Sequence, residues 1–361
     1  MQSGARQWRV QDWLMSDNRR MLIAHLPDGP LAADNFTLDV APMPEVGPGQ
    51  ILIRTSAFTI GAGQRAGLQG SASYAGAPTA GRVMDGSGVG EVIAVGTAAG
   101  PSDVVGTEPV VGDLVRGPLG WQEFAVLRAD QVDVIDGGGN DPALHLGALG
   151  TNGITAYFGL LDVGRPVAGE TVMVSAAAGS VGHLVGQIAA IQGARVVGVA
   201  GSDDKCRLLV DELGFDVAVN YRSADFRDSL KAATPDRIDV YFDNVGGDVL
   251  GSALFRMNTH GRIVCCGAVS AYDTASPGPS PRGIPGLLVN NRVRMEGFLV
   301  FDYESRYAEA RSQMTQWIDA GQMSPRTTDF EGLESAGHAF VELLAGRTMG
   351  TTIVRVAGSG T

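Results

Sequence analysis

The pattern of hydrophobic positions changes once along the chain, near residue 142. Before that point, short runs that alternate apolar and polar residues are separated by glycine and proline. Such runs are typical of strands in an antiparallel, partly closed barrel. The pattern predicts strands at 36–40, 50–58, 88–95 and 121–127, and a turn followed by a strand at 112–117. Residues 71–85 contain few large side chains, and we expect a loop there.

After residue 142, short apolar runs alternate with helical periodicities. Helices are predicted at 143–148, 154–161, 205–213, 226–233 and 248–258. Strands are predicted at 172–174, 195–200, 216–220, 238–242, 262–266 and 293–300. This alternation predicts an α/β fold, a doubly wound parallel sheet with helices on both faces and a ligand at the carboxyl ends of its strands. Two amphipathic helices at 303–320 and 336–345 and a strand at 351–356 follow, and we expect this C-terminal part to return to the first domain.

One stretch, residues 170–204, organises the second half. An apolar strand leads into the small residues of Ala176–Gly182, and a helix and a second strand follow. Small residues let the backbone approach a pyrophosphate at the N-terminus of the helix. A glycine-rich turn is weak evidence alone, but its position between a strand and a helix predicts a dinucleotide site. Gly182 and Gly186 would let the helix pack closely on the sheet.

The residues after the second strand bear on which dinucleotide binds. That strand ends in Gly201-Ser202, where an NAD site usually carries an acid. Lys205 follows one turn into the next helix, where it could meet a 2′-phosphate. Asp203 and Asp204 are acids that could bind the ribose hydroxyls of NAD. They could instead stabilise the first turn of the helix through its dipole. The balance favours NADP.

Composition narrows the class of protein. The 361 residues are 44% hydrophobic and 18% charged, which suits two globular domains. A net charge of −12 argues against nucleic acid and anionic membranes as partners. The chain has three cysteines, no apolar stretch of about 18 residues and no apolar signal segment near its N-terminus, so we expect a cytoplasmic protein without a membrane span.

The sequence offers no set of zinc ligands. Catalytic and structural zinc sites use clustered cysteine and histidine, and the first 153 residues contain no cysteine. His25 and His145 have no partner at ligand spacing. His183, in the first turn after the glycine loop, is predicted to lie on the helix surface. We expect no metal site, and inert thiols at Cys265 and Cys266.

Seven motifs occur in order: GTNGITAYFGL from Gly150, AAAGSVGHLVGQIA, VGVAGSDDKCRLL, LGFDVAVNY, YFDNVGG, GRIVCCGAVSAYD and RMEGFLVFDY. Together they resemble the zinc-independent medium-chain dehydrogenase/reductases. The branch they resemble contains leukotriene B4 12-hydroxydehydrogenase (prostaglandin reductase), plant double-bond reductases and bacterial curcumin reductase. The resemblance is strong over residues 150–356 and looser before them. It implies a GroES-like β-rich substrate domain at 1–153, a Rossmann NADPH-binding domain at 154–300 and a return to the substrate domain at 301–361.

The resemblance also implies NADP(H) as cofactor. It places Lys205 and Tyr221 on the 2′-phosphate, the glycine turn on the pyrophosphate and Asn244 against the cofactor. Taken alone, Tyr221 could be a strand-end aromatic and Asn244 a turn residue that bonds its own backbone. Thr155 and the segments 266–268 and 298–300 would flank the nicotinamide. The complete implied set is Asn152, Thr155, Ala177, Gly179, Ser180, Val181, Gly182, Gly201, Ser202, Lys205, Tyr221, Asn244, Cys266, Gly267, Ala268, Phe298, Leu299 and Val300.

Two segments depart from the family pattern. The family usually has an Asp-Pro-x-Met-Arg segment in the first domain, and this chain has Gly61-Ala62-Gly63-Gln64-Arg65. A tyrosine often found near the substrate is therefore absent. Thr348 stands where the family often has an asparagine that makes a minor phosphate contact.

Without a zinc ligand set, alcohol oxidation lacks its usual Lewis acid. Hydride addition to the β-carbon of an α,β-unsaturated ketone or aldehyde needs only a positioned NADPH, a hydrogen-bond donor and a proton. Tyr272 is the candidate catalytic donor, because a tyrosine hydroxyl stays protonated at neutral pH. It could instead be a loop aromatic that covers the substrate, with a cofactor ribose hydroxyl or water as the donor.

The hypothesis from the sequence is an NADPH-dependent 2-alkenal/2-alkenone reductase. The alternatives are an NADPH-dependent quinone oxidoreductase and a non-catalytic NADPH-binding protein. We expect a small enone or enal as substrate and a homodimer as the assembly. The proline-containing loop 274–286 could cap the cleft or contact a second subunit.

Overall fold

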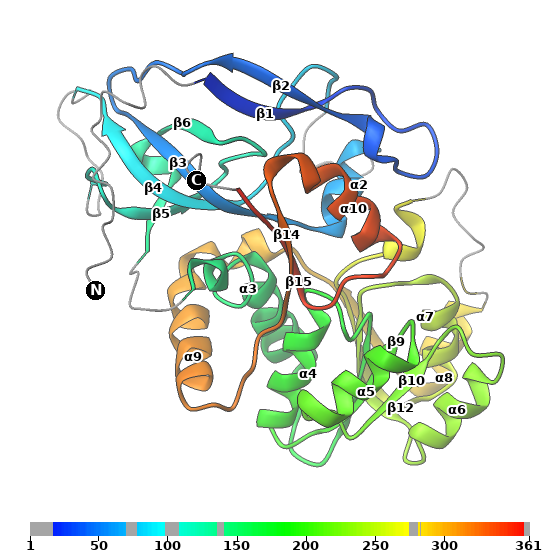
Figure 1. The fold of residues 1–361 in the computed structure, drawn as a ribbon. Helices are drawn as coiled ribbons and strands as arrows, with labels where there is room; N and C mark the ends of the chain where they lie inside the picture. The colour runs from blue at the N-terminus through cyan, green and yellow to red at the C-terminus, as the bar shows by residue number, and fades with distance from the viewer. Residues whose placement is uncertain are drawn as a thin grey trace, which may run out of the picture.

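Two sheets organise the molecule, one in a β-rich half and one in a half built of alternating strands and helices (Figure 1). The computed structural model describes residues 17–69, 78–97, 108–135, 141–273, 281 and 283–356. Residues 71–77 of the predicted loop 71–85 and most of the loop 274–286 lie outside these residues. Both expected layers, the parallel sheet with its helices and the antiparallel β-rich part, are present.

The parallel sheet has six strands in the order β10-β9-β8-β11-β12-β13. Every neighbouring pair is parallel. The order reverses between β8 and β11, so the crevice for a ligand opens where these two strands end. The strands are β8 Thr171–Ser175, β9 Arg195–Ala200, β10 Val217–Asn220, β11 Ile238–Asp243, β12 Met257–Cys265 and β13 Arg294–Gly297.

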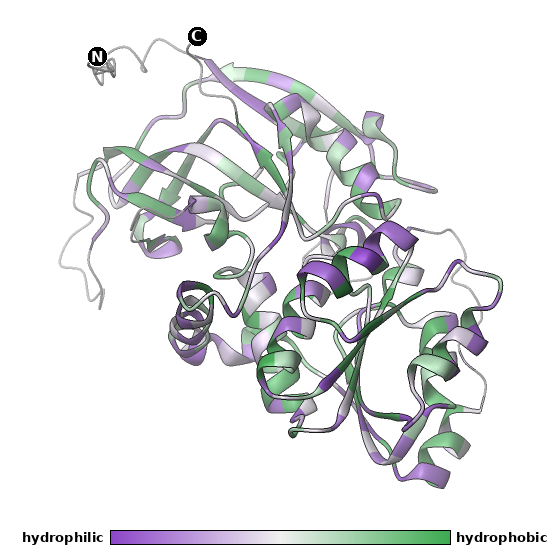
Figure 2. Cartoon of the chain, turned by 60° about the horizontal axis from the view of Figure 1, so that its bottom comes forward, coloured by the Kyte–Doolittle hydropathy of each residue, from purple (hydrophilic) through white to green (hydrophobic). Residues whose placement is uncertain are grey.

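Helices cover both faces of this sheet and form two separate hydrophobic clusters. One cluster contains apolar residues of α3, α4, α5 and α9, and the other contains those of α6, α7 and α8. Hydrophobic and hydrophilic stripes alternate along these helices (Figure 2). The helices are α3 Thr151–Phe158, α4 Gly182–Ile191, α5 Asp203–Glu212, α6 Phe226–Ala233, α7 Gly247–Leu254, α8 Ile284–Asn291 and α9 Tyr307–Asp319.

The β-rich half is centred on the long strand β3 Gln50–Ile60, which pairs with three other strands. The larger sheet has the order β14-β15-β3-β4-β5-β7, with β6 also on β3. Strands β1 and β2 form a separate pair. The other strands are β1 Asp17–Ile23, β2 Phe36–Pro42, β4 Gly88–Val95, β5 Leu114–Gly117, β6 Phe124–Arg128, β7 Asp133–Val134, β14 Thr327–Glu331 and β15 Thr351–Arg355.

The C-terminal segment joins the β-rich half, as the sequence predicts. β15 pairs antiparallel with β3, and α10 Ala336–Leu344 packs on the aromatic core of that half. Trp121 lies at the centre of this core, between Phe36, Phe58 and Phe340. The proposed boundaries at 153/154 and 300/301 stay predictions.

Several predicted boundaries are wrong. The predicted helix 248–258 ends at Leu254, because Met257 already begins β12. The predicted strand 293–300 ends at Gly297. The predicted helix 303–320 starts with a 3₁₀ segment, and the helix predicted at 143–148 is only a 3₁₀ turn at its start. The irregular segments are 3₁₀ at Ala33–Asn35, Ala129–Gln131, Pro142–His145, Val269–Ala271, Val300–Arg306 and Leu333–Ser335, and π at Gly159–Gly164.

The sequence pattern did not predict five strands and helices of the structure: β1, β7, β14, α2 Ala62–Leu68 and α8. The helix α2 has four small residues and little periodicity, and α8 begins inside the proline-containing loop. Among the described residues, no helix is long and apolar enough to cross a membrane.

Candidate functional site

The glycine turn connects β8 to α4 and leaves no room for side chains at its tightest point. A Cβ atom at Gly182 would lie 2.3 Å from the carbonyl oxygen of Ala176, which itself has a positive φ of 47°. Gly179 donates its N–H to the same carbonyl at 2.9 Å. The backbone is therefore exposed to a ligand in the way that a pyrophosphate site requires.

The C-terminal segment before β15 lies against this turn. The N–H of Gly350 donates to the carbonyl of Ala178 at 2.8 Å, and Ser180 donates its hydroxyl to the carbonyl of Gly350 at 3.1 Å. Gly179 and Gly350 also form a parallel bridge. The hydroxyl of Ser180, a predicted cofactor-binding residue, thus donates within the protein. The group that Ser180 can still present to a cofactor is its backbone N–H.

His183 corrects a prediction, because it is not on the helix surface but 1% exposed. Its Nδ1 lies 2.8 Å from the carbonyl oxygen of Gly179, and its Nε2 accepts the N–H of Arg326 at 3.1 Å. Burial is the main cause that lowers the pKa of His183 to about 4. The neutral ring with its proton on Nδ1 satisfies both contacts, so His183 joins the turn to the segment before β14.

Lys205 is buried at the start of α5, with 9% of its surface exposed. Its Nζ donates to the carbonyl oxygens of Gly346 at 2.8 Å and Thr348 at 2.6 Å. Burial, and then the charge of Arg222, lower the pKa of Lys205. An ammonium group has three donors, so one is left for a ligand. Lys205 uses the main-chain carbonyl of Thr348, so this contact does not depend on which side chain stands at position 348.

Tyr221 and Arg222 extend this cationic site. The ring of Tyr221 lies over Gly201, where a Cβ atom would come within 3.1 Å of the ring. Arg222 donates from Nε to the Tyr221 hydroxyl at 3.3 Å. Arg222 is a candidate phosphate residue that the sequence reasoning missed, although its position directly after Tyr221 was a usable signal.

The two acids that favoured NAD have other partners. Asp203 accepts from the side chain of Asn220 at 2.8 Å, and Asp204 pairs with Arg207. Ser202 caps α5, because its hydroxyl oxygen accepts the N–H of Lys205 at 3.3 Å. The first turn of α5 is therefore built as a capped helix start with the Lys205 ammonium beside it.

A hydrogen-bond network connects the carboxyl ends of β8 and β11. Buried Asp243 accepts from the hydroxyl of Tyr241 at 2.6 Å and of Ser175 at 3.2 Å. Burial and the charge of Asp243 raise the pKa of Tyr241 well above its usual value. Asn244 donates from its side chain to the carbonyl of Ser175 at 2.8 Å. Asn244 is thus fixed across the switch point and is not a turn residue bonding its own backbone.

The loop after β12 is anchored by the same network. The N–H groups of Cys266 and Gly267 donate to the carbonyl of Asp243 at 2.9 and 3.2 Å. The Tyr272 hydroxyl accepts the N–H of Ala268 at 3.1 Å. Tyr272 therefore lies across the loop 266–268, and its own proton is not used in that contact.

The cysteines at this end are neutral thiols. Burial raises the pKa of Cys266 to about 12 and that of Cys265 to about 11, and the charge of Asp243 adds to both shifts. The thiolate is the reactive form, so these thiols are inert at neutral pH.

The remaining predicted residues lie on two elements. Asn152 and Thr155 are half-buried on α3, and Thr155 donates its hydroxyl to the carbonyl of Thr151 at 2.7 Å. Phe298 packs on Gly159, where a Cβ atom would come within 2.5 Å of its ring. Leu299 is exposed and Val300 is half-buried. Within the described ranges, no hydrogen bond joins Asn152 or Thr155 to the loop 266–268.

These groups fit NADP(H). The turn at 176–182 is too tight for a Cβ atom at Gly182, as in a pyrophosphate-binding turn, and the buried Lys205 ammonium has a third donor for a ligand. Arg222 adds a second cation beside the ring of Tyr221. Two cations at this position suit a 2′-phosphate, because a ribose hydroxyl would need an acid.

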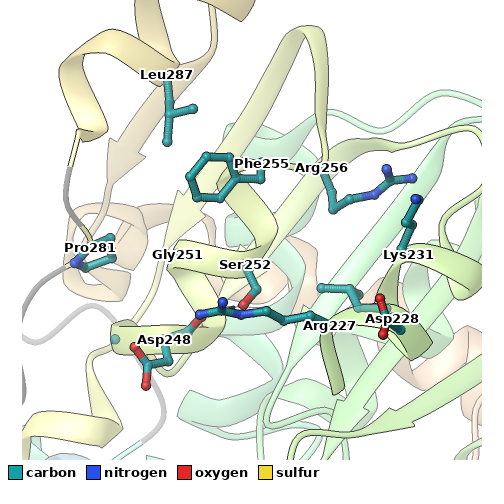
Figure 3. A pocket seen from close by; sticks show the side chains of 12 residues that line it. Arg227, Asp228, Lys231, Asp248, Gly251, Ser252, Phe255, Arg256, Pro281 and Leu287 are labelled. Atoms are coloured by element: carbon teal, nitrogen blue, oxygen red, sulfur yellow. Dashed lines mark hydrogen bonds between the residues drawn. The ribbon is translucent and has the colours of Figure 1, made fainter. Parts of the chain in front are cut away.

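A pocket of about 640 Å³ lies elsewhere, between α6 and α7 (Figure 3). Phe255, Arg256 and Lys231 line one part of it, and Asp248 and Arg227 another. None of the predicted cofactor-binding residues lines it, so it is separate from the site above. In the part of the chain that the structure describes, no group of three or more His, Cys, Asp or Glu side chains could hold a metal ion.

Comparison with known proteins agrees with the fold and with NADP(H) as the cofactor. Residues 19–135 match the family model for the N-terminal domain of oxidoreductase, and residues 180–318 match that for zinc-binding dehydrogenase. The NADPH-dependent curcumin reductase of Escherichia coli is 37% identical over 94% of this chain and 97% of its own. The NADP⁺-dependent 2-alkenal reductase of Nicotiana tabacum is 42% identical over 68% of this chain and 72% of its own.

A solved structure with the same architecture is CurA from Vibrio vulnificus in complex with NADPH. It superposes with a TM-score of 0.87 at 35% identity and covers 94% of this chain and 99% of its own. The fold and site are those of a dinucleotide-dependent oxidoreductase. More particularly, the chain belongs to the medium-chain dehydrogenase/reductase family, in the branch of curcumin and 2-alkenal reductases. The resemblance drawn from the sequence motifs is confirmed.

Proposed function

We propose that this protein is an NADPH-dependent reductase of the conjugated C=C bond of α,β-unsaturated ketones and aldehydes. The observation that carries the proposal is the position of Tyr272. Its hydroxyl accepts from the Ala268 N–H, on the loop expected to flank the nicotinamide. The Tyr272 proton is then available to a substrate oxygen.

NADPH, when bound, would supply the hydride that adds to the β-carbon. The negative charge that develops on the substrate oxygen needs a preorganised donor, and Tyr272, whose hydroxyl is held by the Ala268 N–H, would be that donor. Lys205 and Arg222 would hold the 2′-phosphate, and the backbone of the turn 179–182 the pyrophosphate. We propose that no zinc takes part, because residues 1–153 contain no cysteine and the described residues hold no ligand cluster.

The neutral thiols support the same substrate class. Conjugated enals react with thiolates, and a thiolate beside the loop would be alkylated. The raised pKa values of Cys265 and Cys266 keep both groups protonated. Protonated thiols would not be alkylated by a bound enal, so the site would survive turnover of this substrate class.

The test is NADPH oxidation, followed by absorbance, with a simple enone, a 2-alkenal, a quinone and a saturated ketone. NADH and a chelator are run in parallel. We expect turnover of the enone and the alkenal with NADPH, a saturated carbonyl product and no loss with the chelator. Turnover of the quinone alone would instead establish a quinone oxidoreductase. NADPH binding without turnover of any acceptor would indicate a non-catalytic binding protein.

We also infer a cytoplasmic homodimer. The support for the dimer is β13, which lies at the edge of the parallel sheet and pairs only with β12 in the described chain. Val289 on the adjacent α8 is 73% exposed. Exposed edge strands and apolar residues favour association. Light scattering should give twice the 37.5 kDa of one chain, and a mass of one chain would contradict the dimer.

A further inference from the structure

An ion pair joins the two halves of the molecule directly beside Tyr272. Asp273 accepts the Nε–H of Arg65 at 2.8 Å and the backbone N–H of Leu31 at 2.7 Å, both on the same oxygen. Arg65 lies on α2 of the β-rich half, and Asp273 lies on the loop that follows β12, directly after Tyr272. In Figure 1 this yellow segment reaches from the parallel sheet to the β-rich half.

The Arg65 guanidinium is almost completely buried, whereas its partner Asp273 is partly exposed. The side chain is 1% exposed, while Asp273 keeps 26% exposure. Arg65 also donates from Nη2 to the carbonyl of Gly29 at 2.7 Å, but its buried Nη1 has no hydrogen-bond partner among the described residues. Among the described residues, Asp273 is the only carboxylate that Arg65 contacts. A buried cation with one counter-charge and one unsatisfied donor is costly, so its retention calls for an explanation.

Within the described residues, the segment 266–273 that carries Tyr272 is anchored on two sides. On the side of the parallel sheet, four residues donate to the backbone carbonyls of residues 243–245: Cys266, Gly267, Val269 and Ser270. On the side of the β-rich half, Asp273 accepts from Arg65 and from the N–H of Leu31. The Tyr272 ring lies between these regions, with its hydroxyl on Ala268. The orientation of Tyr272 therefore depends on the contact that its neighbour makes with the other half.

We infer that Arg65 and Asp273 are positioning residues, which fix the Tyr272 hydroxyl by attaching its loop to the β-rich half. This inference rests on the proposed function, in which Tyr272 donates to the substrate oxygen. The residues act through the loop backbone and touch neither substrate nor cofactor. The pair also makes the alignment of the two halves a condition for a correctly placed donor.

The first variant is Asp273→Asn. Asparagine keeps an oxygen that can accept from Leu31 and Arg65, but it removes the counter-charge of the buried guanidinium. We expect kcat on a good enone to fall roughly 10- to 100-fold, because small displacements of a catalytic group cost this much. The Kd for NADPH should change less than about twofold, since Lys205 and the glycine turn are untouched.

A double-mutant cycle separates positioning from general damage. If Asp273 acts through Tyr272, then Asp273→Asn in a Tyr272→Phe background should lower kcat less than about twofold further. An equal loss of kcat in both backgrounds would overturn the inference. A second variant, Arg65→Lys, keeps the charge but cannot reach both Asp273 and Gly29, and it should show the same dependence on Tyr272. Arg65→Lys replaces Asp273→Asn in the cycle if Asp273→Asn does not fold.

The matched control is Asp141→Asn. Asp141 also pairs with an arginine, Arg355 on β15, and accepts a backbone N–H, from Ala143, but it lies away from the loop. Its kcat should stay at the wild-type value. Failure of the wild type to reduce any enone would sink the proposed function itself. A wild type that reduces enones, with an Asp273→Asn variant of equal kcat, would overturn only the positioning role.

Discussion

Lys205 is a buried lysine, and burial lowers the pKa of its ammonium group. The backbone carbonyls of Gly346 and Thr348 accept hydrogen bonds from its Nζ, and such bonds favour the charged form. With Arg222 nearby, the site has two cations and an unused donor, which an anionic ligand would complete. A 2′-phosphate is such a ligand, and a ribose hydroxyl is not.

Replacing Lys205 should therefore change cofactor choice. We expect Lys205→Ala to raise the Kd for NADPH about 10- to 100-fold, because a hydrogen bond to a charged group contributes roughly 1.5–3 kcal/mol. The Kd for NADH should change little. Fluorescence titration measures both. The control is Arg207→Ala on the same helix, whose side chain pairs with Asp204; equal losses for NADPH and NADH in Lys205→Ala would contradict the assignment.

His183 should make stability depend on pH. Its pKa is lowered to about 4 by burial, against 6.5 in the unfolded chain, so the unfolded state binds more protons between these values. Stability is then fully present above pH 6.5 and is lost as the pH falls toward 4. At pH 5 the loss should be about 2 kcal/mol relative to pH 7.

Denaturant unfolding at pH 7 and pH 5 measures this loss. His183→Gln, which cannot be protonated, should show a smaller decrease between the two pH values than the wild type. His338→Gln is the control, because the side chain of His338 is 65% exposed. The same pH dependence in wild type and His183→Gln would show that His183 is not the cause.

Some of the site could be predicted from local sequence and some could not. Gly182, Lys205 and Asn244 follow strands at fixed distances, so motif and spacing were enough to select them. Arg222 and His183 needed the tertiary fold. The carbonyls that hold Lys205 come from residues more than 140 positions later, and a backbone carbonyl leaves no trace in the side-chain pattern.

At the scale of elements, α4 shows how one glycine sets a packing distance. A Cβ atom at Gly186 would lie 1.8 Å from the ring of Phe215. Gly186 therefore makes room for the Phe215 ring, which also lies against Gly198 of β9. The sequence predicts that Gly186 lets α4 pack directly on the sheet; the neighbour that needs the space is instead Phe215, which precedes β10.

Gly186→Ala should destabilise the protein by about 1–3 kcal/mol, since the extra methyl group overpacks the core. Denaturant unfolding measures the effect. Gly63→Ala in α2 is the matched control, because a Cβ atom there meets nothing within 4 Å. That change should be neutral or stabilise by up to about 1 kcal/mol. Phe215→Leu should restore part of the loss in Gly186→Ala, and a Gly186→Ala variant as stable as the wild type would refute this packing.

Elements with strong periodicity were predicted well, and those with weak periodicity were not. α6 has the bounds that the pattern gave, and β4 does too. β14 was missed because its residues, TTDFE, alternate weakly and become a strand only by pairing with β15. The start of α9 was placed too early, because the residues before Tyr307 adopt 3₁₀ geometry around the stacked rings of Phe158 and Tyr303.

At the scale of the molecule, the C-terminal segment connects the two sheets. Residues 346–350 hold Lys205 and the glycine turn on one side, and β15 continues directly into pairing with β3 on the other. The pair Arg65–Asp273 makes a second connection beside Tyr272. The proposed cofactor-binding residues and Tyr272 are thus each connected to the β-rich half, where we expect the walls of the substrate pocket.

The central claim is hydride addition to the β-carbon of a conjugated carbonyl compound. The direct measurement uses NADPH deuterated at C4, in each of its two epimers, with a simple enone. We predict that one epimer delivers deuterium to the β-carbon of a saturated ketone, as NMR of the product would show. Turnover of unlabelled NADPH in D₂O should place deuterium at the α-carbon. Deuterium on the carbonyl carbon of an alcohol product, or no transfer from either epimer, would contradict the account.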